Sequence, residues 1–298
     1  MKNVIVGIDF SKGSLNAMQH AVSIAAKYNA KLTLLFVISP DTKNLVEKGI
    51  SKSNIVPFVE EKLKKLVTEC KMLLPKSAVV EHKIRIGRIS KEINAEANEQ
   101  ASKQTKKSKK QDDTLIVLGT HGFGGFEEFF IGNSAFKTIS AATCPILTVN
   151  EKVEIQRDLT DILIIIDDTF ETLQKVPHAI SLAKAFQAKV HIMGLYTAKY
   201  VNIRRTTDAF VKRAEILLME NNVRFSTEHV EMNNRKIDVV LDYAAKEKIN
   251  LIIVMKEVEL AGDNVFIMAP FSERIVNRSP VPILTLNVDE TIYPEFKI

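Results

Sequence analysis

Cysteine is scarce in this sequence, since Cys70 and Cys144 are the only two among 298 residues and they form no C-x-x-C pair. This scarcity excludes a disulfide scaffold, argues against a cysteine zinc site and fits a reducing compartment. Long apolar runs are missing too, because no run reaches the roughly 20 residues of a membrane-spanning helix. Asp9 falls where the apolar part of a signal peptide would still be running, so no secretion signal is expected. These absences predict a cytoplasmic protein that does not enter a membrane.

A large charge excess is also lacking. The 41 Lys and Arg residues against 36 Asp and Glu residues give a net charge of +5, which is too mild to predict nucleic-acid binding by itself. Much of this excess is local, in one run of five lysines at Lys103, Lys106, Lys107, Lys109 and Lys110. A run without interleaved aromatics is typical of a solvated helix end or loop, with attraction to an anionic surface as the alternative.

Strand-like and helix-like segments alternate along the first half of the chain. The apolar strand segments are Val4–Ile8, Leu32–Ile38, Val79–Ile86, Leu115–Leu118 and Pro145–Val149. The segments with helical periodicity are Leu15–Tyr28, Pro57–Leu74, Ile89–Gln100 and Ser134–Ala142. Such alternation predicts a parallel sheet that is covered by helices on both faces.

The pattern then repeats in the second half. Asp9 and Asp167 each follow an apolar strand, and this pair has the same 158-residue spacing as His20 and His178. The last strand of the first half, Pro145-Ile-Leu-Thr-Val, returns as Pro282-Ile-Leu-Thr-Leu. We therefore predict a duplication that gives two domains, residues 1–150 and 151–298. The predicted fold class is α/β, with two tandem Rossmann-like domains, each an open parallel five-stranded sheet flanked by helices.

Glycine is rare, yet five of the 11 glycines gather in one loop after the fourth strand: Gly119, Gly122, Gly124, Gly125 and Gly132. Such a loop brings bare backbone N–H groups close to a ligand, and it leads into a helix N-terminus, which favours an anion. The loop thus predicts a nucleotide phosphate site, with a glycine-rich connection that binds nothing as the alternative. The corresponding loop of the second half keeps only Gly262 and has Pro270, which lacks an N–H, so we expect the second half to have lost the site.

The loop matches neither common phosphate fingerprint, because it lacks Gly-Lys-Ser/Thr and the first strand is not followed by G-x-G-x-x-G. Its spacing is G-x2-G-x9-G at positions 119, 122 and 132. Together with Asp9 after the first strand and Gly-Thr-His-Gly after the fourth, the sequence resembles the universal stress protein family, specifically its tandem two-domain members. The resemblance covers essentially the whole chain and implies the adenine nucleotide alpha hydrolase-like fold.

The resemblance also implies a set of binding residues in the first domain. In nucleotide-binding members, the first-strand Asp contacts the adenosine and a residue ending the second strand lines the base pocket, while the glycines and a following Ser or Thr hold ribose and phosphates. Carried over, this set is Asp9, Val37, Gly119, Gly122, Gly132, Asn133 and Ser134. Asn133 departs from the family pattern, although its amide can still donate. The loop also carries four aromatics, which we expect either to pack against the partner domain or to narrow the pocket: Phe123, Phe126, Phe129 and Phe130.

The function implied by the resemblance is a stress-response protein that binds ATP, ADP or AMP in the first domain and is regulatory rather than catalytic. Mg²⁺ would accompany ATP, and no metal ligand from the protein is expected. The two domains would face each other as an intrachain pseudo-dimer, and a further homodimer is left open. One alternative is an interaction or scaffold protein of the same fold that binds no nucleotide. Another is a slow ATP hydrolase, for which His121 is the only candidate base.

Overall fold

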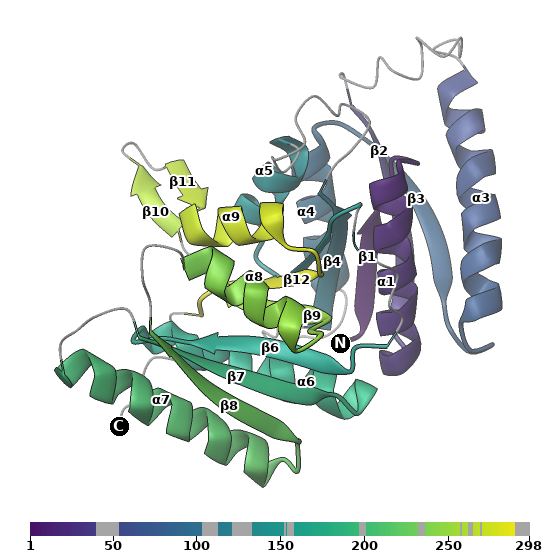
Figure 1. Ribbon diagram of the computed structural model, residues 1–298. Coiled ribbons are helices and arrows are strands. Elements are labelled where there is room, and N and C mark those ends of the chain that lie inside the picture. Colours follow the sequence, from purple (N-terminus) through teal and green to yellow (C-terminus); the bar gives the residue numbers. More distant parts are fainter. Residues whose placement is uncertain are drawn as a thin grey trace. The chain divides into compact units, whose positions relative to one another are not determined.

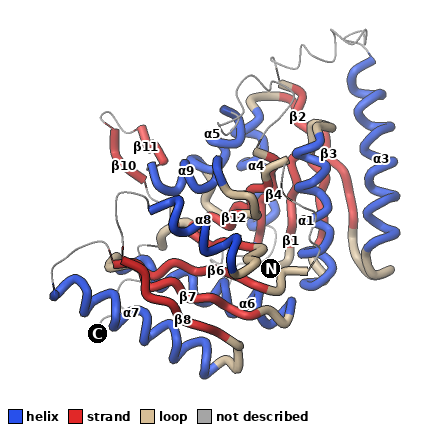
Figure 2. The backbone as a smooth tube through the Cα atoms, in the orientation of Figure 1, coloured by secondary structure: helices blue, strands red, loops and turns tan. Residues whose placement is uncertain are grey.

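The chain folds as two compact units, Met1–Arg157 and Asp158–Ile298. The computed structural model describes residues 1–39, 54–102, 113–120, 133–151, 153, 158–196, 201–231, 236–256, 258–261, 265–268 and 270–289. In each unit a parallel sheet carries helices on both faces (Figure 1 and Figure 2). The predicted fold class, α/β with two tandem domains that each contain an open five-stranded sheet, is thereby confirmed.

The sheet of the first unit has the strand order β3-β2-β1-β4-β5, and its paired strands run parallel. Its strands are β1 (Asn3–Gly7), β2 (Lys31–Ile38), β3 (Val80–Ile86), β4 (Thr114–Gly119) and β5 (Ile146–Val149). Residues 4–6 of β1 and 116–117 of β4 are fully buried, because central strands of a doubly covered sheet have no face in water. The order reverses between β1 and β4, since β1 leads to β2 on one side and pairs with β4 on the other.

Helices α1 (Lys12–Tyr28) and α3 (Ile55–Leu73) cover one face of this sheet, and α4 (Ile89–Ser102) and α5 (Asn133–Ala141) cover the other (Figure 1). Helix α1 begins where Ser11 Oγ accepts a hydrogen bond from Ser14 N at 3.1 Å, and it ends at Asn29 in the left-handed region. The cap at Ser11 places the start of α1 three residues before the predicted one.

The second unit repeats this topology with the order β12-β9-β6-β7-β8. Its strands are β6 (Asp161–Ile166), β7 (Lys189–Tyr196), β8 (Phe225–Glu231), β9 (Leu251–Met255) and β12 (Ile283–Leu286). Its helices are α6 (Lys175–Phe186), α7 (Val201–Glu220), α8 (Lys236–Lys246) and α9 (Pro270–Arg278), with a short 3-10 helix, η3 (Phe170–Gln174), before α6. Asn16 of α1 and its repeat counterpart Gln174 each donate to the chain that leaves the last strand of their own unit.

The third strand of each unit carries a Glu-His pair, Glu81-His82 and Glu228-His229, but the two pairs do not occupy equivalent positions in the sheets. His82 of β3 lies opposite Leu34, whereas His229 of β8 lies opposite Gly194. The counterpart of Gly194 in the first unit is Phe36, which lies opposite Ile84. By position in the ladder, His229 therefore corresponds to Ile84, two residues beyond His82, and a shift of two keeps the same face of a strand.

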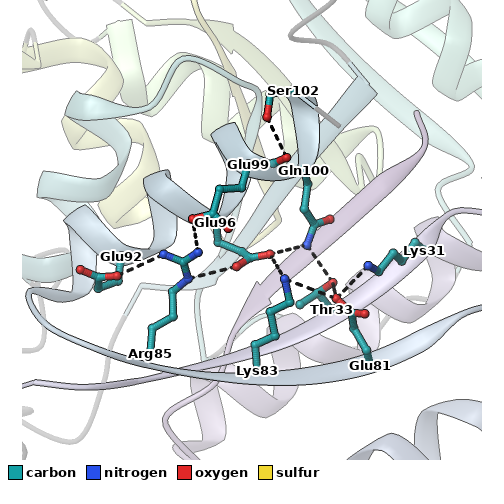
Figure 3. Close-up of polar contacts among 10 residues, drawn as sticks. All are labelled: Lys31, Thr33, Glu81, Lys83, Arg85, Glu92, Glu96, Glu99, Gln100 and Ser102. Atoms are coloured by element: carbon teal, nitrogen blue, oxygen red, sulfur yellow. Dashed lines mark hydrogen bonds and ion pairs between the residues drawn. The ribbon is translucent and has the colours of Figure 1, made fainter. Parts of the chain in front are cut away.

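Helix α4 is held to the edge strand β3 by buried charge (Figure 3). The side chain of Glu96 is fully buried and accepts hydrogen bonds from Lys83 Nζ at 2.6 Å, Gln100 Nε2 at 2.8 Å and Arg85 Nε at 3.0 Å. Burial alone would raise the pKa of Glu96, but these hydrogen bonds and the charge of Lys83 outweigh it, so the pKa lies below its ordinary value. The buried carboxylate is thus ionised and paired.

Arg85 extends this network along the same helix (Figure 3). Its guanidinium also pairs with Glu92, at 3.3 Å, and with Glu99 on α4. Since Glu92, Glu96 and Glu99 lie at helical spacing, they present their carboxylates on one face of the helix. A single arginine on the strand therefore contacts two turns of α4 and fixes the helix over the edge of the sheet.

Candidate functional site

The carboxyl ends of β1 and β4 lie side by side where the strand order reverses. The two strands pair in register from Asn3 with Thr114 to Val6 with Val117, so Asp9 and Thr120 follow neighbouring strand ends. In open parallel sheets, ligands bind outside this edge at the point of reversal. The structure thus brings Asp9 and Gly119, which are 110 residues apart in the sequence, to the same edge.

Asp9 builds the turn that leads into α1. Its Oδ1 accepts a hydrogen bond from Ser11 N at 2.9 Å, and its own N–H donates to Ser14 Oγ at 3.3 Å. Within the described part of the chain, no hydrogen bond is made by the second carboxylate oxygen of this half-buried side chain. One oxygen of Asp9 therefore shapes the turn, and the turn does not use the other.

The second unit builds the same turn at Asp167. Thr169 N donates to Asp167 Oδ1 at 3.2 Å, and Asp167 N donates to Thr172 Oγ1 at 3.1 Å. These positions are all 158 residues after those of the first unit, so the repeat seen in the sequence extends to individual hydrogen bonds. An aspartate at this position consequently has a structural role in both units.

Gly119 is needed for packing as well as for any ligand. A Cβ atom at this position would lie 2.6 Å from the carbonyl carbon of Gly13 and 2.8 Å from Ser14 N, in the first turn of α1. In the second unit, Met255 and Glu171 occupy the positions of Gly119 and Gly13, and the first turn there is 3-10 rather than α-helical. Sequence reasoning missed Gly13, for which an isolated glycine at a helix start was the available signal.

Val37 is a core residue near the end of β2, with 8% of its surface exposed. Thr33, on the same face of the strand, accepts a hydrogen bond from Gln100 of α4 at 3.0 Å, so the Val37 side chain also faces the α4 layer. The other face carries Phe36, whose ring stacks on Phe10 with 5.2 Å between centroids. Phe10 has a φ of 63°, a rare conformation for a bulky residue, and it directly follows Asp9.

The remaining predicted site residues are only partly covered by the described chain. Asn133 and Ser134 open α5, and nothing is described of their side chains. Gly122 and Gly132 lie outside the described residues, as do His121, the loop phenylalanines and the lysine run from 103 to 110. Of the predicted site residues, the structure therefore places Asp9, Gly119 and Val37, which is near the end of β2, at the same edge of the sheet.

The second unit has a hairpin where the first has its glycine loop. Strands β10 (Val258–Ala261) and β11 (Val265–Met268) pair antiparallel, from Val258 with Met268 to Ala261 with Val265. Helix α9 follows, with Pro270 as its first residue. Backbone N–H groups that join a ladder are engaged with the partner strand, so this segment presents fewer bare donors than an open loop would.

His20, which recurs in the second unit as His178, is a core residue. It is 3% exposed, and its Nε2 has no hydrogen-bond partner among the described residues. Burial lowers its pKa from 6.5 to about 4, so it is neutral at neutral pH. Among the described residues no carboxylate or nucleophile is hydrogen-bonded to this ring, so the geometry gives His20 a structural role.

Acidification is expected to destabilise the first unit through His20. Since its folded pKa is depressed, its stabilising contribution is complete above the unfolded pKa of 6.5 and is lost as pH falls toward the folded value of about 4. Between about pH 7 and about pH 5 the loss is about 2 kcal/mol. Urea unfolding of wild type and His20→Leu should show this loss only in wild type. A His82→Leu control should keep it, and an unchanged pH dependence in His20→Leu would refute the assignment.

The described residues contain neither a cluster of metal-ligand side chains nor a membrane-spanning helix. No group of three or more His, Cys, Asp and Glu side chains there is arranged to hold a metal ion. None of the described helices is both long enough and apolar enough to cross a bilayer.

The strand order and the edge at Asp9 and Gly119 define a doubly wound α/β protein made of two similar domains. The sequence profile of the Universal stress protein family matches residues 1–150. The chain belongs to the universal stress protein family.

Individual relatives agree with this assignment. The chain is 31% identical to Universal stress protein MJ0531 of Methanocaldococcus jannaschii over 150 residues, which make up 50% of this chain and 82% of that protein. It is 24% identical to Universal stress protein Sll1388 of Synechocystis sp. over 153 residues, 49% of this chain and 96% of that protein. The crystal structure of a universal stress protein from Archaeoglobus fulgidus matches the fold with a TM-score of 0.68 and 15% identity, covering 96% of this chain and 98% of that one.

Proposed function

We propose that the first domain binds an adenine nucleotide, ATP, ADP or AMP, and that the protein is a regulatory rather than a catalytic member of its family. The observation that carries the proposal is the position of Asp9 and Gly119 at adjacent strand ends, where the strand order reverses. Membership of the universal stress protein family supports it.

The proposed contacts follow from the chemistry of each group. The second carboxylate oxygen of Asp9 accepts hydrogen bonds from the adenosine, and the end of β2 near Val37 borders the base. Backbone N–H groups of the glycine loop, with the N-terminus of α5, hold the phosphates. The loop residues in these roles are Gly119, Gly122, Gly132, Asn133 and Ser134. Mg²⁺ would arrive with the triphosphate, without a dedicated protein ligand.

We further propose that the second domain has lost this site. Its Asp167 keeps the turn, but Met255 replaces Gly119 and the hairpin of β10 and β11 replaces the loop. The bulkier residue and the engaged backbone donors both argue against close approach of a phosphate.

A cytoplasmic location is part of the same proposal. Cys70 and Cys144 are both buried, and neither is in a disulfide. Burial, with a smaller contribution from the charge of Glu69, raises the pKa of Cys70 to about 12, so its thiol is protonated and unreactive. Buried free thiols are ordinary in a reducing compartment.

Calorimetric titration of the full chain with ATP tests the proposal through a matched pair of variants. Asp9→Ala and Asp167→Ala remove the same turn hydrogen bond, one in each unit. We expect Asp9→Ala to weaken ATP binding at least about tenfold, the effect of losing a charge-assisted hydrogen bond, and Asp167→Ala to leave it unchanged. Equal weakening by both variants would contradict the assignment to the first domain.

A second pair of variants tests the glycine loop in the same titration. Gly122→Leu should abolish ATP binding, because its side chain blocks the approach of the phosphates, whereas the matched change Val258→Leu should have no effect. Circular dichroism of each variant checks that the fold is retained.

A scaffold that binds no nucleotide is the second candidate, and one observation favours it. Asp167 keeps the same turn in a unit without the glycines, so Asp9 is explained by structure alone. A null ATP titration of correctly folded wild-type protein would establish this candidate over the first. Phosphate release from ATP that disappears in His121→Ala would instead indicate a slow hydrolase.

A further inference from the structure

A second group of polar side chains lies at the carboxyl ends of β7 and β8, in the unit without the glycine loop. Tyr196 and Glu231 form the last pair of these strands, and His229 lies two residues earlier on the same face as Glu231. The corresponding last pair in the first unit is Ile38 with Ile86, and the counterpart of His229 is also an isoleucine. The second repeat has thus placed a polar cluster where the first has aliphatic side chains.

The proton positions in this cluster follow from hydrogen-bond counting. Tyr196 Oη contacts both Asp208 Oδ1 and His229 Nδ1, the latter at 2.6 Å. A carboxylate only accepts, so the single hydroxyl proton of Tyr196 goes to Asp208. Burial and the hydrogen bond to Asp208 raise the pKa of Tyr196 to about 12, which keeps that proton in place. The contact with His229 must therefore be an Nδ1–H that donates to the tyrosine oxygen.

This arrangement fixes the tautomer of His229. A neutral imidazole with its proton on Nδ1 has its lone pair on Nε2. The side chain of His229 is exposed, and Gly194 beneath it leaves room for the ring, since a Cβ there would lie 3.2 Å from Nδ1. The Asp208 carboxylate, the Tyr196 hydroxyl and the His229 imidazole thus form a hydrogen-bonded relay. The relay orients the ring through Nδ1, on the side opposite Nε2, as the third group of a triad orients a catalytic base.

A cation lies beside the relay. The guanidinium carbon of Arg204 is 4.6 Å from the centroid of the Tyr196 ring, and one of its nitrogens pairs with Glu231 at 2.8 Å. A guanidinium has five N–H donors, so the pair with Glu231 leaves donors for an incoming anion. Metal binding is the less favoured alternative, because the described residues supply no third ligand.

We propose that His229 is a phosphoryl-acceptor site, which takes a phosphoryl group on Nε2 from a small donor of the phosphoramidate class. The Nε2 lone pair forms the new N–P bond, and the P–N bond of the donor breaks. The donor nitrogen, which is protonated in neutral water, leaves as ammonia. The proton on Nδ1 stays, and its hydrogen bond to Tyr196 and Asp208 stabilises the positive charge that the modified ring acquires. The site is independent of the nucleotide site in the first unit.

Incubation of the full chain with phosphoramidate tests the site, with mass spectrometry locating an acid-labile, alkali-stable phosphoryl group. Wild type should take up one group at His229 faster than the urea-denatured chain does. His229→Asn should lose it, and Tyr196→Phe should react about fivefold more slowly, the change expected from one lost hydrogen bond. His82→Asn, which alters a half-buried strand histidine in the other unit, is the control and should react as wild type does.

Two results would overturn the proposal. One is labelling of His229 at the same rate in the native and the denatured chain, which would mean that the relay does nothing. The other comes from nitrogen-15 NMR of the wild-type imidazole, which needs no variant to fold. A lone pair on Nδ1 instead of Nε2 would exclude the relay.

Discussion

Replacing Glu96 with alanine is expected to lower the free energy of unfolding of the first unit by about 4 kcal/mol. The reason is that Lys83 and Arg85 both converge on this fully buried carboxylate. Without it both cations lose the buried carboxylate between them, and Gln100 also loses a hydrogen bond. Breaking a buried pair by removing one partner costs more than the net contribution of the intact pair. Arg85 keeps Glu92 and Glu99, and Lys83 keeps Glu81 at 3.7 Å, but both lose the one partner that is fully buried.

Glu99→Ala is the matched control for this prediction. Glu99 also pairs with Arg85, but its side chain is 48% exposed, so water replaces the carboxylate and the expected loss is below about 1 kcal/mol. Urea unfolding of the full chain, with hydrogen exchange in β3 and α4 to assign the transition to the first unit, measures both. Similar losses for Glu96→Ala and Glu99→Ala would show that burial of the network contributes nothing.

Gly119→Ala is expected to destabilise the first unit by about 3 kcal/mol and to weaken ATP binding. The new methyl group would lie 2.6 Å from the carbonyl carbon of Gly13 and 2.9 Å from its oxygen. Both are backbone atoms at the start of α1, so the clash is relieved only if the helix moves away from β4. Such a movement also displaces Asp9, because Ser11 and Ser14 bond it to the same turn.

Gly7→Ala provides the comparison for this second prediction. Its added methyl group meets the Leu118 side chain at 2.9 Å and that of Ile93 at 3.6 Å. Side chains turn aside more easily than backbone does, so the expected cost is about 1 kcal/mol, with ATP binding unchanged. Thermal unfolding and the ATP titration measure both variants. Equal losses of stability in Gly7→Ala and Gly119→Ala would mean that α1 can move away from β4 without a large cost in free energy.

The two repeats show how one architecture accepts different chemistry at equivalent positions. Glu96 on α4 and Thr33 on β2 correspond to Tyr243 on α8 and His191 on β7. In the second unit His191 Nε2 lies 3.0 Å from Asp161 Oδ1, and its Nδ1 lies 3.2 Å from the Tyr243 hydroxyl. Each pair lies in a buried polar position, between β2 and α4 in the first unit and between β7 and α8 in the second. The hydrogen-bonding groups of each pair are satisfied by a different set of partners.

The sequence by itself determined the order of strands and helices, the duplication and the edge at which a ligand is expected. Strand β2 ends at Ile38 and helix α1 ends at Tyr28, as predicted. These ends could be predicted because the apolar periodicity of a segment indicates which of its faces is buried and where that pattern stops. Asp9 and Gly119 could be placed at one edge of the sheet because the carboxyl ends of parallel strands lie at the same edge. The family resemblance, rather than periodicity, supplied the nucleotide.

Only the tertiary structure decided which residues are needed where distant segments meet. A glutamate at position 96 belongs to a polar helix sequence, yet it is fully buried because Lys83 and Arg85 of another element neutralise it. The contact of Gly119 with Gly13, the hairpin of β10 and β11, and the relay from Asp208 to His229 likewise leave no local pattern. Sequence periodicity reports burial along a single element, whereas charge pairing and steric fit depend on the partner that folding brings to it.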